Sequence, residues 1–101
     1  MRLSDDDLHG RSVIAADGMA IGELSVFYFD SDTWQVQSCE VKLRKDAAER
    51  LGAERSMFRG PGTIEIPTRL IRSVGDAILL SVTIDELRQV LPSASEPAPA
   101  P

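Results

Sequence analysis

Residues 13–24, VIAADGMAIGEL, place an Asp-Gly pair between two apolar segments. Asp-Gly is a strong hairpin signal because both positions tolerate the positive φ that tight turns require. The stretch therefore predicts a strand at residues 13–15 that turns back into a longer strand beginning near Ala20. Gly18 and Gly22 lack the third glycine and the strand-to-helix setting of a phosphate-binding loop, so we assign them to chain reversal and bending.

The second strand, IGELSVFYFD, is rich in the β-branched and aromatic residues that fit a pleated surface. Its apolar residues do not alternate strictly, so a bulge near Gly22 or Ser25 is needed to keep one set facing inward. That inward set is Ile21, Leu24, Phe27 and Phe29. After a polar turn at residues 30–33, a third strand is expected in WQVQSCEVKL. Its predicted core side carries Val36, Cys39, Val41 and Leu43.

Residues 45–52, KDAAERLG, predict a helix of two turns at most. Asp46 is its expected N-cap, with Glu49 as capping-box partner and Gly52 at the C-terminal end. The segment TIEIP that follows predicts a strand ending at Pro67, which cannot donate to a strand ladder.

RLIRSVGDAILLSV predicts two strands joined by a tight turn at Gly75 and Asp76, with Ile78, Leu80 and Val82 on one face. The pattern then changes to helical spacing in TIDELRQVL, where Thr83 and Glu86 fit a capping box.

The chain is long enough for one domain, since 101 residues of which 43% are apolar suffice for a single core. The elements predict a mainly β fold: a small antiparallel β-barrel of about six strands with a short helix and a C-terminal helix. We expect an N-terminal leader at residues 1–6 and the barrel at 7–91. PSASEPAPAP at 92–101 has no large apolar residue, so we expect a disordered tail.

The chain contains, in this order, the segments GRSVIAADGMAIGEL, FYFDSDTWQV, IEIPTRLI and VGDAILLSVTIDEL. Together these four segments resemble the PRC-barrel family, named for the photosynthetic reaction centre H subunit and shared with a ribosome-maturation factor. They cover about residues 7–91 in the family's order. Trp34 departs from the family, which often has a small turn residue there, and so does the long polar insert KDAAERLGAERSMFRGPG.

The resemblance implies a six-stranded PRC-type barrel that acts as a non-catalytic contact module, often as a homodimer when it stands alone. It therefore implies a protein-binding scaffold or adaptor rather than an enzyme. The residues themselves define no catalytic, cofactor or metal site, because His9 is the only histidine and Cys39 has no visible base to activate it. We expect no cofactor.

The net charge of −5 makes nucleic acid an unlikely default partner. A single cysteine excludes an internal disulfide, and no apolar run of about 18 residues exists, so we expect a cytoplasmic protein without membrane insertion. Residues 1–41 carry two basic and eight acidic side chains, whereas residues 42–72 carry eight basic and four acidic ones. This segregation suits contact with another protein or a second copy, unless the two blocks mix in space.

Trp34 sits in a polar turn, where it serves either as a lid over the barrel end or as an exposed anchor; tryptophan is enriched in interface hot spots. Val26, Tyr28 and Trp34 would form an outward apolar stripe that needs a partner. Met57 and Phe58 either plug the barrel mouth or form a partner-binding loop.

Basic residues flank this loop, and they also suggest a second function. Arg55 and Arg59 flank Met57 and Phe58 in the loop reading. In the alternative function, an RNA- or ribosome-associated accessory factor would use the basic segment at residues 42–59. Its cations are Lys42, Arg44, Lys45, Arg50, Arg55 and Arg59.

Overall fold

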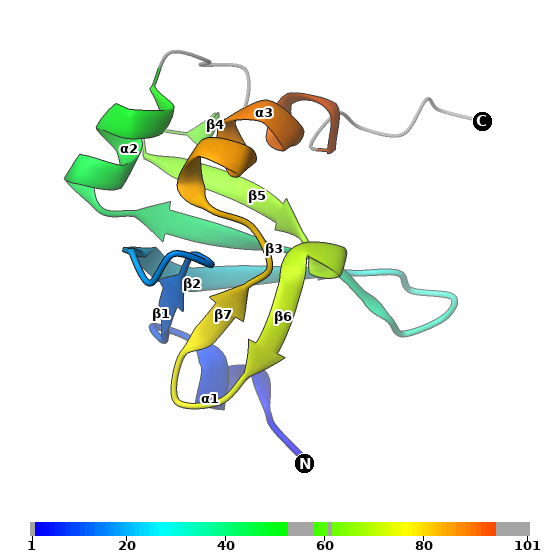
Figure 1. Ribbon diagram of the computed structural model, residues 1–101. Helices are drawn as coiled ribbons and strands as arrows, with labels where there is room; N and C mark the ends of the chain where they lie inside the picture. Colours follow the sequence, from blue (N-terminus) through cyan, green and yellow to red (C-terminus); the bar gives the residue numbers. More distant parts are fainter. Residues whose placement is uncertain (1, 53–57, 61, 95–101) are drawn as a thin grey trace.

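The computed structural model describes residues 2–52, 58–60 and 62–94, which form one mainly β domain with short helices (Figure 1). The sheet has seven strands in the order β4-β5-β3-β2-β1-β7-β6 within this described part. The elements in chain order are α1 (Asp5–Leu8), β1 (Ser12–Ile14), β2 (Ala20–Phe29), β3 (Val36–Leu43), α2 (Lys45–Leu51), β4 (Phe58–Gly60), β5 (Thr63–Pro67), the 3₁₀ turn η2 (Thr68–Leu70), β6 (Ile71–Val74), β7 (Ile78–Leu80) and α3 (Ile84–Ala94).

The Asp-Gly hairpin is confirmed. The N–H of Gly18 donates to the carbonyl of Ala15 at 2.9 Å, and the N–H of Ala15 donates to the carbonyl of Met19 at 2.8 Å. Gly18 has a φ of 87°, in the left-handed region that glycine adopts without steric cost. The reversal therefore uses a three-residue loop, with glycine at its left-handed position.

β2 carries the predicted bulge, and Gly22 lies at a close approach between β2 and β3. A Cβ built at Gly22 would lie 2.2 Å from the carbonyl oxygen of Lys42, so β2 and β3 approach closely at a point where only glycine fits. The pairing of β2 with β3 shifts between Leu24 and Val26, which places the expected bulge at Ser25.

The bulge brings most of the predicted inward set to the core. Ile21 and Leu24 are buried, and Phe27 is half-buried against the core. The prediction for Phe29 was wrong, since 52% of its surface is exposed. A second irregularity between Tyr28 and Phe29 takes the strand out of register, and Phe29 lies where β2 leaves the core. On β3, Cys39 and Val41 are buried, but Val36, opposite Phe29, is exposed.

The expectation of a closed antiparallel barrel was wrong. β1 pairs with β7 in parallel, so the sheet is mixed. The terminal strands β4 and β6 pair only with β5 and β7 in the described part of the chain, which leaves the sheet open. Non-local pairing of this kind has no local sequence signal, because β1 and β7 are each only three residues long and far apart in the sequence.

Pro67 ends β5, as expected, and η2 then turns the chain toward β6. The hydroxyl of Thr68 lies 3.1 Å from the carbonyl oxygens of both Val36 and Gln37, to which it donates, and so fastens this corner to the start of β3. β6 and β7 form the predicted hairpin, but Gly75 does not adopt the positive φ of a glycine-first two-residue turn, because the connection extends through Ala77.

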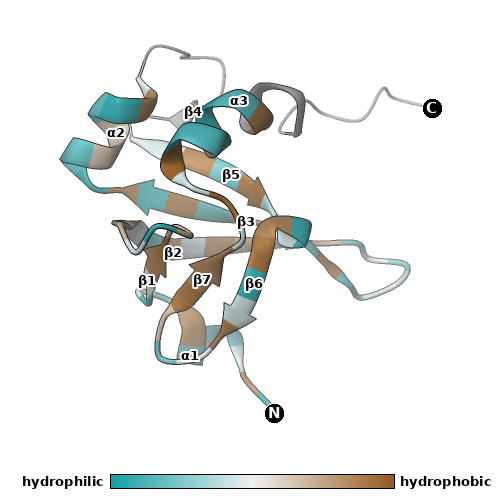
Figure 2. Cartoon of the chain, in the orientation of Figure 1, coloured by the Kyte–Doolittle hydropathy of each residue, from teal (hydrophilic) through white to brown (hydrophobic). Residues whose placement is uncertain are grey.

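The two larger helices pack together on one side of the sheet, and Figure 2 shows their hydrophilic residues mostly on the outside. α3 begins with the predicted capping box: the Thr83 N–H donates to Glu86 at 2.9 Å, and the Glu86 N–H donates to the Thr83 hydroxyl at 3.2 Å. The helix extends through Pro92 to Ala94, further than predicted. Residues 95–101 of the predicted tail lie outside the described residues.

The N-cap prediction for α2 was wrong. The helix begins at Lys45, so Asp46 lies inside its first turn and makes no cap. Arg44 occupies the cap position without a side-chain hydrogen bond. The Asp46 carboxylate instead pairs with Arg44 at 3.5 Å. Its negative charge near the helix N-terminus also interacts favourably with the positive end of the helix dipole. Gly52 follows α2 as predicted, but in a right-handed conformation.

One apolar core joins the sheet to both helices. Each helix contributes side chains with at most 1% of their surface exposed, and Ser38 is the only buried polar residue in the described part of the chain. No helix in this part is both long and apolar enough to cross a membrane. The buried core residues are Val13, Ala15, Ile21, Leu24, Cys39, Val41, Ala47, Leu51, Ile64, Ile66, Leu70, Ile78, Leu80, Ile84 and Leu87.

Candidate interaction surface

The connection between β2 and β3 forms an arm, residues 29–36, that projects from the body of the molecule (Figure 1). Asp30 organises its turn: one carboxylate oxygen accepts from the N–H groups of Asp32 at 2.7 Å and Thr33 at 3.1 Å. Its carbonyl accepts from the N–H of Trp34 at 2.7 Å. The side-chain bonds are those of an Asx turn, which explains why an aspartate ends this strand.

Trp34 is exposed over 77% of its surface, so the lid alternative does not hold. Its ring stacks on Phe29 with 5.4 Å between ring centroids and 17° between planes. Its φ of 63° makes it the only non-glycine residue with positive φ in the described part of the chain, a conformation that costs about 1–3 kcal/mol and marks functional sites more often than other positions. The turn thus holds two stacked aromatic rings in water.

The predicted outward stripe is present only in part. Val26 and Tyr28 are exposed over 39% and 37% of their surfaces. Val26 lines the same groove as Trp34, but Tyr28 is not among the lining residues. The Tyr28 hydroxyl donates to the Glu40 carboxylate at 2.8 Å, which directs its ring along the neighbouring strand β3.

An apolar groove of about 840 Å³ lies beside the arm, and three segments far apart in the sequence form it. They are the N-terminal segment with α1, the second half of β2 with the start of β3, and η2 with β6. Sequence reasoning assigned residues 1–6 to a leader and did not find this groove. The lining residues are Leu3, Ser4, Asp5, Leu8, His9, Ser25, Val26, Phe27, Phe29, Trp34, Val36, Thr68, Ile71, Arg72, Ser73 and Val74.

A capping box holds the acidic turn beside the groove. Ser4 caps α1 by accepting from the Asp7 N–H at 3.2 Å, and the Asp7 carboxylate accepts from the Ser4 N–H at 2.9 Å. The hydrogen bond from the Ser4 backbone N–H, with a smaller contribution from the Ser4 hydroxyl, lowers the pKa of the Asp7 carboxyl and keeps it charged. The same short turn places Asp5 on the groove wall.

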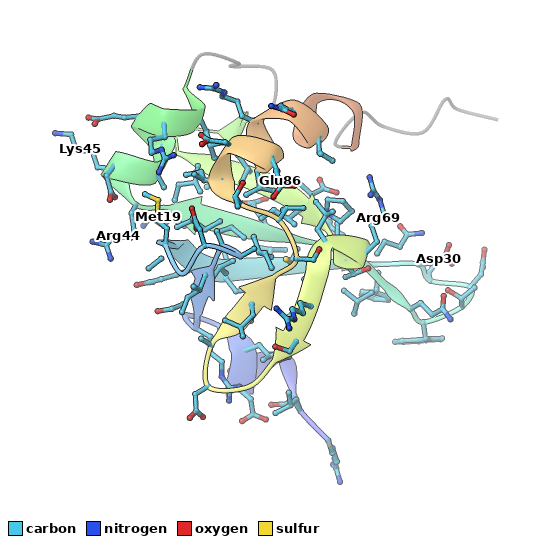
Figure 3. All side chains as sticks on the ribbon, in the orientation of Figure 1. Met19, Asp30, Arg44, Lys45, Arg69 and Glu86 are labelled. Atoms are coloured by element: carbon cyan, nitrogen blue, oxygen red, sulfur yellow. The ribbon has the colours of Figure 1, made fainter. Side chains whose placement is uncertain are left out.

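The basic block of the sequence does not form one patch. Figure 3 shows Arg44 and Lys45 at the α2 side of the molecule, whereas Arg69 lies on the opposite side near the arm with Asp30. Arg50 bonds both carboxylate oxygens of Asp85, at 3.1 and 3.2 Å, and joins α2 to α3. Of the cations predicted to bind RNA, Arg44 and Arg50 are therefore paired with carboxylates, and Lys42 and Lys45 are exposed.

The predicted loop around Met57 lies largely outside the described residues. Arg55 and Met57 lie outside the described residues. Phe58 and Arg59 belong to β4, at one edge of the sheet, and their side chains are also outside the described part.

Cys39 lies in the core, as predicted. Burial raises the pKa of its thiol to about 11, with a smaller contribution from the charge of Glu65. A thiol with such a pKa stays protonated at neutral pH and is a poor nucleophile. His9 lines the groove. The described residues contain no group of three or more histidine, cysteine or acidic side chains placed to hold a metal ion.

No known family model and no curated protein matches this chain. The resemblance to PRC-barrel proteins therefore rests on the four sequence segments alone, and the arm and the groove are the surface features that point to a function.

Proposed function

We propose that this chain is a non-catalytic protein-interaction module of the cytoplasm, related to the PRC-barrel family, working as a homodimeric scaffold or adaptor. The observation that carries the proposal is the arm. Phe29, Trp34 and Val36 are exposed over 52%, 77% and 43% of their surfaces, and Val26 lies next to them along the groove. A contiguous exposed apolar surface of this kind is the usual mark of a protein-binding site.

The chemistry of the arm supports a partner rather than a substrate. Trp34 and Phe29 are large, rigid side chains held in place by the turn, so they lose little conformational entropy on binding. The acidic residues Asp30 and Asp32 lie on the same turn as these rings, so polar groups adjoin an apolar centre, as in a typical interface.

Light scattering over a dilution series tests the homodimer. We expect a dimer that Trp34→Ala weakens by about 2 kcal/mol or more, the loss typical of an interface hot spot. Leu79→Ala is the matched control, because Leu79 is 38% exposed on β7 and is not part of the arm or groove. A wild-type monomer at every concentration would contradict the homodimer, and equal effects of the two substitutions would contradict the role of Trp34.

A further inference from the structure

The groove lies against a stretch of β2 that has a strand neighbour on one side only. β1 pairs with β2 at Ala20, Gly22 and Glu23, and the backbones of Gly10 and Arg11 extend the contact to Leu24. Beyond this point β3 continues along the other side of β2 as far as Phe29. Within the described chain, the β1 side of β2 has no main-chain partner at Val26 or Phe27.

β6 forms a second unpaired edge on the same groove. It ends the sheet, pairing with β7 through Ile71, Ser73 and Val74, and its other edge has no neighbour among the described strands. All four residues of β6 line the groove. An unpaired edge presents N–H and carbonyl groups that another extended chain can use.

We propose that this groove binds an extended peptide segment of another protein by strand addition, with apolar side chains at alternate positions and a basic residue at the end that meets α1. The inference deepens the proposed interaction function and rests on it. A small apolar ligand or a lipid chain would fill the groove without using the main-chain groups at its edges, whereas a peptide strand uses both.

The floor of the groove fits the alternate apolar residues of such a strand. Leu8, Phe27, Ile71 and Val74 each pack against the core on one side and line the groove on the other. A bound strand would direct every second side chain onto this floor and the others to solvent. The volume of about 840 Å³ lies within the range of known binding pockets.

The charges around the groove explain why the proposed peptide carries a basic residue at one end. Asp5 lines it, Asp6 and Asp7 follow on the same exposed turn, and none of the three makes an ion pair in the described part of the chain. Arg72 of β6 and His9 also line the groove, and the charge of Arg11 acts on Asp7. The acidic side chains near the groove are thus gathered on α1. A lysine or arginine on the peptide would complement that end.

Trp34 lines the groove and is the only tryptophan, so its fluorescence reports binding directly. The probe is an acetylated, amidated heptapeptide of one lysine followed by three Val-Thr repeats. Two further versions carry N-methyl groups on alternate residues, one along each edge of the extended chain, which remove N–H donors and keep every side chain. We expect the parent peptide to bind and at least one methylated version to lose tenfold or more in affinity.

A Glu-for-Lys version of the peptide tests the charge selection. We expect it to bind at least threefold more weakly at low salt, with the difference shrinking at high salt. Val26→Asp tests the site, because Val26 lines the groove, and Leu79→Asp is the control at nearly equal exposure, 39% against 38%. We expect a loss of tenfold or more for Val26→Asp and no loss for Leu79→Asp, with circular dichroism confirming that both variants fold.

Three results would overturn the inference. The parent peptide does not bind; both methylated versions bind as tightly as the parent; or Val26→Asp and Leu79→Asp behave alike. Light scattering on the same samples distinguishes failure of the peptide site from failure of the proposed function. A protein that dimerises but binds no peptide would support the homodimer and contradict the peptide site. Peptide binding that disappears as the dimer forms would assign the groove to a second copy instead.

Discussion

At the scale of single residues, Gly22 is the described glycine at which an added Cβ would clash most severely. Its substitution by alanine would place a Cβ 2.2 Å from the Lys42 carbonyl, and the obstacle is backbone of the adjacent strand. We expect Gly22→Ala to lower the free energy of unfolding by about 3 kcal/mol, the upper part of the range for overpacking. Urea unfolding followed by circular dichroism measures the loss.

Gly75→Ala is the matched control for this prediction. A Cβ there meets nothing within 4 Å, and the backbone has no positive φ. We expect an effect between zero and a gain of about 1 kcal/mol, since alanine reduces the freedom of the unfolded chain. Equal losses for the two glycines would mean that the close approach of β2 and β3 does not restrict Gly22.

Cys39 links the core to pH. Its folded pKa of about 11 lies above the ordinary value of 9.0, so the unfolded state releases the thiol proton first as the pH rises. The resulting contribution to stability is complete below pH 9 and is lost between pH 9 and about 11. We expect the difference in unfolding free energy between wild type and Cys39→Ala to fall by on the order of 2 kcal/mol over this window. A difference that stays constant from pH 8 to 11 would contradict the assignment.

At the scale of elements, the strands next to glycine and proline were predictable because turn chemistry is local. The hairpin at Gly18, the end of β5 at Pro67 and the start of α3 at Thr83 depend on residues adjacent in the sequence. The errors came from features that need distant partners or extra residues. Phe29 was misplaced because a second irregularity follows the bulge at Ser25.

The two helix starts give a direct test of the capping analysis. Thr83→Ala removes the hydroxyl that accepts from Glu86, so we expect a loss of about 1 kcal/mol in unfolding free energy. Asp46→Ala removes a side chain that resembles a cap in sequence but only pairs with Arg44 at the surface, so we expect a loss of at most about 0.5 kcal/mol. Urea unfolding compares the two variants. Equal losses of unfolding free energy would show that the capping-box hydrogen bonds at Thr83 stabilise α3 no more than the surface pair at Asp46 stabilises α2.

At the scale of the whole molecule, the open sheet and the groove were beyond sequence reasoning. The parallel pairing of β1 with β7 joins residues more than sixty positions apart, and the groove is built from the N-terminal segment, β2 and β6. Among the candidate residues, Val26 and Trp34 were predictable from exposure on a strand and a turn. Leu8, Ile71 and Val74 were not, because each carries the pattern of an ordinary core residue and becomes groove floor only when the sheet stays open.

One core joins the sheet to α2 and α3 in the described part of the chain, so the helices and the arm are expected to unfold together. Leu87 of α3 is fully buried, and Trp34 lies on the arm outside the core cluster. Leu87→Ala would cost about 3 kcal/mol, which lowers the melting temperature of a domain this small by roughly 10–20 °C. Because the domain unfolds as a unit, far-ultraviolet circular dichroism and Trp34 fluorescence should shift by the same amount.

Leu87→Met is the control, since it conserves volume and costs less than about 1.5 kcal/mol. If Leu87→Ala moved the circular dichroism transition and left the Trp34 transition in place, α3 would form a separate unit laid on an independently stable sheet. The arm and the groove would then keep their shape without the helices. Coincident transitions instead mean that α3 and the sheet that carries the arm and the groove unfold as one cooperative unit.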